Sequence, residues 1–151
     1  MYWNEKIELV KQRYSDKEFS VPNVNRKRIL REIEVQFISR SADYYQSNSF
    51  NTRFANWWDN IKQNDQKVLT SKQDLTACLS ELINPNDTFW IAAEFVDGIM
   101  IYKTKKDAAL YLMSIGRTWV NTYHMIHLKF KYLISFRIEA STIEVKRSGE
   151  V

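Results

Sequence analysis

Glycine, proline and cysteine are scarce in this sequence of 151 residues, which contains 3 Gly, 2 Pro and 1 Cys. The shortage of glycine excludes a Gly-rich phosphate loop and a dinucleotide-binding fingerprint, and it argues against a hinge between two domains. One cysteine cannot form an intramolecular disulfide. The sequence has no run of about 20 uncharged apolar residues and no apolar stretch near its charged start. We therefore expect a single cytoplasmic domain over residues 1–151, with no contact to a membrane.

Charge of one sign is not concentrated in any segment. The chain has 22 Lys and Arg against 18 Asp and Glu, a net charge of +4, and the basic cluster that begins at Arg26 is followed directly by Glu32 and Glu34. A nucleic-acid-binding protein usually gathers its cations on one stretch or face, because each phosphate contact needs a cation nearby. The interleaved charges therefore disfavour nucleic acid as a partner.

The first half of the sequence repeats apolar residues at the spacing of amphipathic helices. In the clearest case Ile29, Ile33 and Phe37 form one apolar stripe, and charged residues lie on the opposite side. Ser71 and Thr104 each precede an acidic residue by three positions, which is the pattern of a helix-capping box. The predicted helices cover residues 4–14, 26–40 and 52–64. A further predicted helix is capped by Ser71 and ends before Asn84, and a short one lies between Thr104 and Gly116.

The second half is richer in strand-forming residues. Asp97 and Gly98 separate two apolar runs and are typical of a two-residue hairpin loop. The predicted strands cover residues 89–96, 99–102, 123–128, 132–139 and 142–146, and in the fourth of them Tyr132, Ile134, Phe136 and Ile138 share one face while Ser135, Arg137 and Glu139 share the other. This order predicts an α+β fold in which N-terminal helices pack on a C-terminal, mainly antiparallel sheet with one inserted short helix.

Residues with catalytic or metal-binding chemistry are few and dispersed. His124 and His127 are three apart on a predicted strand, so they face opposite sides of the sheet and cannot share a metal ion. Cys78 lies on the apolar stripe of its helix, where we expect a core thiol. No Gly-x-Ser-x-Gly nucleophile elbow is present. We therefore predict no catalytic residue, no metal and no cofactor, and a protein that is not an enzyme.

One short pattern leaves a different chemistry open. Glu144 and Lys146 at a strand end are similar to the Glu-x-Lys half of metal-dependent nucleases. That chemistry also needs an upstream acid, for which Asp97 or Asp107 would have to serve. Both acids already have predicted structural positions, one in the hairpin and one at a helix start, so a nuclease remains only an alternative.

Aromatic residues make up 14% of the chain and include two adjacent pairs. Neighbours on a helix lie about 100° apart, so two bulky residues in succession seldom both face the core. In the predicted helix 52–64 we expect Trp58 in the core and Trp57 at the surface beside Arg53. Exposed aromatic and Arg side chains are the types that anchor protein interfaces. The predicted partner-binding residues are Tyr44, Tyr45, Arg53, Trp57 and Arg137.

The run from Tyr123 to Ile134, preceded by the aromatic positions of residues 89–91 and 101–102, resembles a group of small bacterial proteins with a similar hairpin, short helix and strand pair. Their layout resembles that of the SUKH-type immunity proteins encoded beside polymorphic toxins. The resemblance covers about the last half of the chain. Tyr132 stands where that group has Trp, and the chain lacks both the Asn-His-His-Asp stretch and the Leu-Pro-x-Asp-Tyr helix entry.

This resemblance implies a non-enzymatic bacterial binding protein, namely an immunity protein that occludes a toxin domain by steric blocking. The alternative is a nucleic-acid-binding or metal-dependent nuclease-like protein that uses the basic and aromatic residues. Salt dependence separates these two possibilities, because binding through phosphates weakens steeply as salt rises.

Overall fold

The computed structural model describes residues 2–22, 25–39, 56–62, 64–95, 98–115 and 120–149. In these ranges the α-helices are α1 (Trp3–Arg13), α2 (Arg26–Phe37), α4 (Lys72–Leu82) and α5 (Lys106–Ser114), and η2 (Trp58–Asn60) is a 3₁₀ turn. The strands are β1 (Phe19–Ser20), β2 (Asp65–Leu69), β3 (Thr88–Phe95), β4 (Gly98–Lys105), β5 (Thr122–His127), β6 (Tyr132–Ile138) and β7 (Ile143–Gly149).

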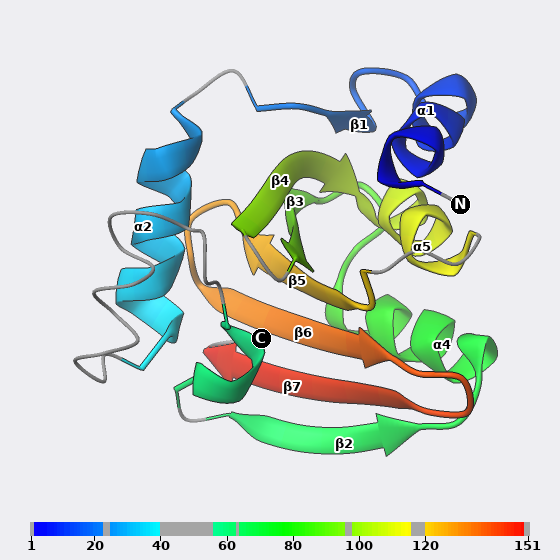
Figure 1. Cartoon of the computed structure of the whole chain (residues 1–151). Helices are drawn as coiled ribbons and strands as arrows, with labels where there is room; N and C mark the ends of the chain where they lie inside the picture. The colour runs from blue at the N-terminus through cyan, green and yellow to red at the C-terminus, as the bar shows by residue number, and fades with distance from the viewer. Residues whose placement is uncertain are drawn as a thin grey trace.

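The strands form one sheet in the order β1-β4-β3-β5-β6-β7-β2, and each neighbouring pair is antiparallel. Strands β5, β6 and β7 make the expected meander, and β3 and β4 make the expected hairpin. The predicted α+β class is therefore confirmed. Helices cover both faces of the sheet: α1, α4 and α5 lie on one side and α2 lies on the other (Figure 1).

Strand alternation divides the core into two layers. In β3, Phe89 and Ile91 face α1, α4 and α5, whereas Trp90 and Ala92 face α2. The predicted division of β6 is also confirmed, because Tyr132, Ile134, Phe136 and Ile138 all belong to the first layer. The sheet thus presents one apolar face to three helices and a more polar face to α2.

Hydrogen bonds at the helix starts explain where α2 and α4 begin. Asn25 Oδ1 accepts from the backbone N–H of Lys27 at 3.0 Å, and Ser71 Oγ accepts from Asp74 N at 3.1 Å, as its capping box predicted. The second predicted box is wrong: Thr104 is buried in β4, its hydroxyl donates to the carbonyl of Lys105, and α5 begins one residue later than a Thr104 cap requires.

The predicted hairpin loop is displaced by one residue. Phe95 pairs with Gly98, so Gly98 belongs to β4 and residues 96–97 connect the strands. Two strands were not predicted at all. β1 is only two residues long, and β2 is almost entirely exposed, so neither carries the alternation that identifies a strand. β2 nevertheless pairs with β7 at the edge of the sheet.

The helix predicted for 52–64 is wrong within the described residues 56–62. This segment contains only the 3₁₀ turn η2, and then Ile61 forms an isolated antiparallel bridge with Ile38 at the end of α2. Ser39 N donates to the carbonyl of Asn60 at 2.6 Å, and Lys62 N donates to the carbonyl of Phe37 at 2.8 Å. Pairing with the chain that leaves α2 therefore replaces the helical hydrogen bonds.

This geometry also overturns the expected exposure of Trp57. The side chain of Trp57 is 0% exposed and that of Trp58 is 2% exposed, so both are buried. The reasoning from 100° helical spacing does not apply to an irregular segment that lies against a sheet. Trp58 is in the core as predicted, and Trp57 is not at the surface.

We expect Trp57→Ala to lower the free energy of unfolding by about 4 kcal/mol, because it empties a large buried volume. Tyr2→Ala, at an aromatic residue that is 76% exposed, is the matched control and should change it by less than about 0.5 kcal/mol. Urea unfolding of both variants measures the difference. Equal effects would contradict the burial of Trp57.

Candidate binding surface and the buried network beside it

Polar residues line up across the sheet on the face that α2 covers. Cross-strand pairing places His124 opposite Ser135 and Ser135 opposite Lys146, and it makes Thr122 the neighbour of both Glu94 and Arg137. Sequence reasoning named His124, and Ser135 as one residue of a strand face, but it did not predict that Glu94 and Ser135 would both hydrogen-bond to His124. Their alternation on single strands is visible in the sequence, but the pairing that brings three strands together is not.

His124 is hydrogen-bonded through both ring nitrogens. Its Nε2 lies 2.5 Å from Glu94 Oε2, and its Nδ1 lies 2.6 Å from Ser135 Oγ. An ionised carboxylate can only accept, so Nε2 carries a proton, and in the neutral imidazole Nδ1 then accepts from the Ser135 hydroxyl. His124 and Ser135 are both 0% exposed. The cluster is therefore a fully satisfied polar network in the interior.

Glu94, His124 and Ser135 are the residue types of a nucleophilic serine triad. A nucleophile must be reachable by substrate, yet the hydroxyl of Ser135 is completely buried and the indole of Trp57 packs edge-on against the imidazole, with ring centroids 5.4 Å apart. Glu94 Oε1 also accepts from the backbone N–H of Trp57 at 3.0 Å. The role that this geometry supports is to hold the Trp57 segment on the sheet.

The neighbouring Trp58 is fixed by two cations. Lys146 Nζ donates to the carbonyl of Trp58 at 2.8 Å and lies 4.5 Å from its ring centroid, and Arg137 lies 4.8 Å from that centroid. Arg137, a predicted partner-binding residue, is therefore half-buried and engaged within the fold. Glu144 and Lys146 do share a face, but Lys146 holds Trp58. In the described ranges no three His, Cys, Asp or Glu side chains are grouped as metal ligands.

Glu34 of α2 faces the same layer and is 2% exposed. Burial raises the pKa of its carboxyl from 4.5 to about 7, and the nearby indole N–H of Trp57 opposes part of that rise. Glu34 Oε2 and Trp57 Nε1 are nevertheless both buried without a hydrogen-bond partner in the described structure. The carboxyl is thus the least well satisfied ionisable group of this layer.

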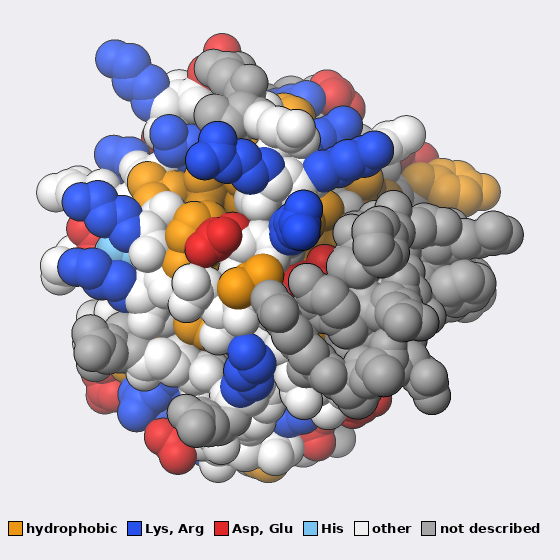
Figure 2. All heavy atoms as spheres, turned by 90° about the vertical axis from the view of Figure 1, so that its left-hand side faces the viewer, with side chains coloured by type: hydrophobic (Ala, Val, Ile, Leu, Met, Phe, Trp, Pro, Cys, Tyr) orange, Lys and Arg blue, Asp and Glu red, His pale blue; other side chains and the backbone are white. Residues whose placement is uncertain are grey.

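An open hollow of about 460 Å³ lies on the same side of the sheet, between α2 and the turn that joins β5 to β6. Ile29, Trp90, Leu128 and Phe130 supply its apolar lining, and Arg28 lies among them. Figure 2 shows hydrophobic side chains in the middle of this face with Lys and Arg side chains around them. The surrounding polar lining residues are Asn25 and Glu32.

Phe130 reaches this hollow from an unfavourable backbone conformation. Its φ is +59°, a left-handed value that bulky residues rarely adopt and that favours glycine. The turn is closed by hydrogen bonds from Phe130 N to the carbonyl of His127 and from Lys129 N to His127 Nδ1. The ring of Phe130 is partly buried against the α2 layer. A phenyl ring therefore occupies a position where glycine would have a lower backbone energy, next to an open hollow.

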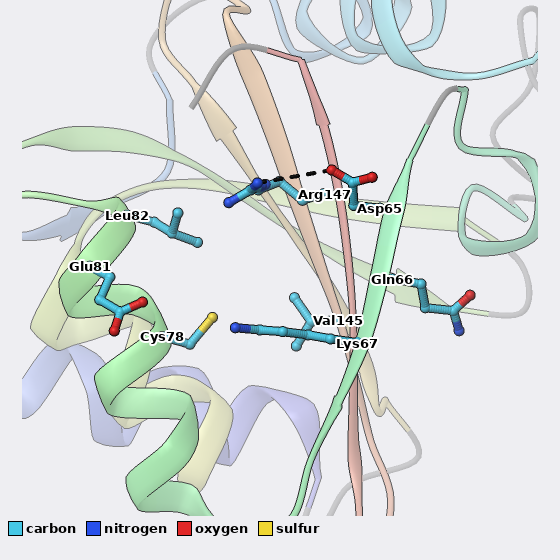
Figure 3. Close-up of a pocket in the computed structure, with 8 residues that line it drawn as sticks. All are labelled: Asp65, Gln66, Lys67, Cys78, Glu81, Leu82, Val145 and Arg147. Carbon is cyan, nitrogen blue, oxygen red and sulfur yellow. Dashed lines mark ion pairs between the residues drawn. The ribbon is translucent and has the colours of Figure 1, made fainter.

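A second hollow of about 210 Å³ lies between α4 and the β2 and β7 edge (Figure 3). Cys78 and Lys67 point into it and toward one another, and Arg147 contacts Asp65 at 3.9 Å across its rim. Cys78 is 4% exposed and is one of the buried core residues, as predicted. The pair of Arg147 and Asp65 is largely exposed and contributes little.

The remaining predicted site residues divide into two groups. Tyr44, Tyr45 and Arg53 lie outside the described residues. His124 and His127 do face opposite sides of the sheet: His124 is buried toward α2, and the half-exposed His127 packs against Tyr132 at 5.2 Å. Of the predicted partner-binding residues that the structure describes, neither Trp57 nor Arg137 lines the hollow at α2, and the lining residues were not among the predicted ones.

Comparisons with protein-family models, curated proteins and solved structures find no match to this chain. No helix in the described part of the chain is long and apolar enough to cross a membrane.

The network predicts unequal effects for the two histidines. His124→Ala should lower the free energy of unfolding by about 3 kcal/mol, because it leaves Glu94 and Ser135 without their central partner and opens a cavity. His127→Ala, on the other face of the same strand, should cost less than about 1 kcal/mol. Chemical denaturation at neutral pH distinguishes them, and a small effect at His124 would show that the network does not hold the fold.

The buried carboxyl of Glu34 should make the stability of the wild-type protein depend on pH. Because its folded pKa is raised to about 7, the stability that its neutral form provides is full below pH 4.5 and is lost as pH rises through 7. Glu34→Gln cannot ionise, so it should gain stability relative to wild type between pH 5 and pH 8, on the order of 2 kcal/mol. The control is Glu32→Gln, two residues away on the same helix, whose difference from wild type should stay flat in urea unfolding across this range.

Proposed function

We propose that this protein is a non-enzymatic cytoplasmic binding protein that acts as an immunity protein and blocks a toxin domain sterically. The observation that carries the binding function is the open apolar hollow formed by Ile29, Trp90, Leu128 and Phe130, with Arg28 in its lining. Aromatic residues and Arg around an apolar centre are the side chains that contribute most to protein interfaces. The toxin as partner is supported by the resemblance of the C-terminal half to SUKH-type proteins.

The backbone of the β5–β6 turn adds a second line of support. A left-handed Phe130 costs free energy that a glycine would avoid, on the order of 1 kcal/mol. Strained positions of this kind cluster where a side chain is needed for binding. The conformation of Phe130 keeps a phenyl ring at the edge of the hollow, where a partner could contact it. Binding by shape also requires no catalytic group, which agrees with a histidine and a serine that are both 0% exposed.

Nucleic acid is the second candidate, because the same face carries cations. Arg28 lines the hollow and Lys129 lies in the turn between Leu128 and Phe130, and both are exposed. A nucleic acid held by such cations would release counterions on binding, so its affinity would fall steeply as salt rises. A packed apolar interface would show a much weaker salt dependence, which separates the two candidates by experiment.

Affinity capture from a nuclease-treated lysate of the source organism tests the proposal. Phe130→Gly removes the ring and keeps a residue that adopts positive φ readily, so the fold should be retained. We expect the wild-type protein to retain a specific protein at both low and moderate salt. Phe130→Gly should retain at least about tenfold less of that protein.

The matched control is Val68→Ala, which alters an exposed apolar residue on β2, far along the sheet from the hollow. This variant should retain the partner like wild type. The proposal is wrong if untreated lysate yields nucleic acid whose retention disappears with salt. It is also wrong if the captured protein binds Phe130→Gly as strongly as wild type.

A further inference from the structure

We infer that the α2 hollow receives an acidic segment of a partner protein, in which an apolar side chain enters the hollow and carboxylates on either side contact its basic rim. This inference rests on the proposed binding function and adds the chemistry of the partner. It is drawn from the charges, the apolar lining and the shape of this surface.

The rim of the hollow is mainly basic. Arg28 lies in the lining, Lys129 is in the turn between Leu128 and Phe130, and Lys103 is the cross-strand neighbour of Trp90 on β4. All three cations are exposed. They come from three elements that are distant in sequence, so only the fold brings them to one face. Carboxylates are the complementary groups for such a rim, and charge complementarity of this kind gives specificity and a fast association rate.

The one acid in the described lining is already engaged. Glu32 Oε1 accepts from Gln36 Nε2 at 3.2 Å, one turn further along α2. Arg28 makes no ion pair of 4.0 Å or less with any acid in the described ranges. The guanidinium is therefore available to a carboxylate from outside, with which it can form two parallel hydrogen bonds.

The floor of the hollow is apolar. Trp90 lines it and is 8% exposed, but its indole Nε1 is buried and therefore closed to a ligand in the hollow. Ile29, Leu128 and Phe130 complete the apolar lining. An apolar side chain of the partner therefore fits the hollow, while carboxylates on either side of it can reach the basic rim.

A random 12-residue peptide library displayed on phage tests this chemistry without knowledge of the natural partner. It is selected separately on wild type, Arg28→Glu and Arg31→Glu. The last two variants make the same charge change on the same exposed side of α2, but Arg31 does not line the hollow. Peptides enriched on wild type are then synthesised, and their affinities are measured by calorimetry.

We expect the enriched peptides to carry Asp or Glu on both sides of an apolar residue. They should bind Arg31→Glu about as well as wild type and Arg28→Glu at least about tenfold more weakly. Replacing the peptide's Glu by Gln should weaken binding to wild type as well. The inference is overturned if no peptides are enriched, if the enriched peptides have no excess of acidic residues, or if they bind Arg28→Glu as well as wild type. Displacement of the peptides by single-stranded dT20 would also overturn it.

The two tests fail independently. If lysate capture finds no partner but acidic peptides depend on Arg28, the chemistry of the hollow stands and the proposed function fails. If lysate capture finds a protein that needs Phe130 but the peptides lack excess acid, the binding function stands and the acidic partner is wrong.

Discussion

The hydrogen bonds of His124 are the interaction on which the α2 side of the molecule depends. An imidazole in the middle of a sheet, 0% exposed, is tolerated only when both of its nitrogens are satisfied. Ser135 and Glu94 do this from the strands on either side. Glu94 then uses its other oxygen to bind the backbone of Trp57. The network thus joins three strands to an irregular segment that has little regular structure of its own.

This arrangement explains why one face of the sheet is polar. Three helices supply enough apolar surface to cover the opposite face, whereas α2 and the segment 56–62 have to cover this one. Cations stack on Trp58, and the carboxyl of Glu34 stays buried with a pKa raised to about 7. The cover is incomplete at Trp90, where the α2 hollow remains open. An open apolar surface on the α2 side of the sheet is a direct result.

Particular elements show what could be read from the residues. α2 and α4 were predictable because their apolar stripes and their N-terminal caps lie within a few residues of one another. β6 was predictable because its two faces differ in polarity. β2 was not, since almost every one of its side chains is exposed and the residues of β7 with which it pairs are 74 to 82 positions away in the sequence. The prediction that Trp57 is exposed was wrong because residues 52–64 have a helical spacing of apolar residues, yet the backbone of residues 60–62 pairs with the end of α2 instead.

The sequence by itself determined the α+β class, the amphipathic helices and the opposite orientation of the two histidines, because these follow from local periodicity and from the alternation of side chains along a strand. The tertiary structure alone decided that Glu94, His124 and Ser135 meet, and that Arg28 of α2 lines one hollow together with Trp90 of β3 and Phe130 of the β5–β6 turn. Those contacts depend on strand order, register and the position of α2 against the sheet. Register is set by the packing of the whole core, so no stretch of neighbouring residues encodes it.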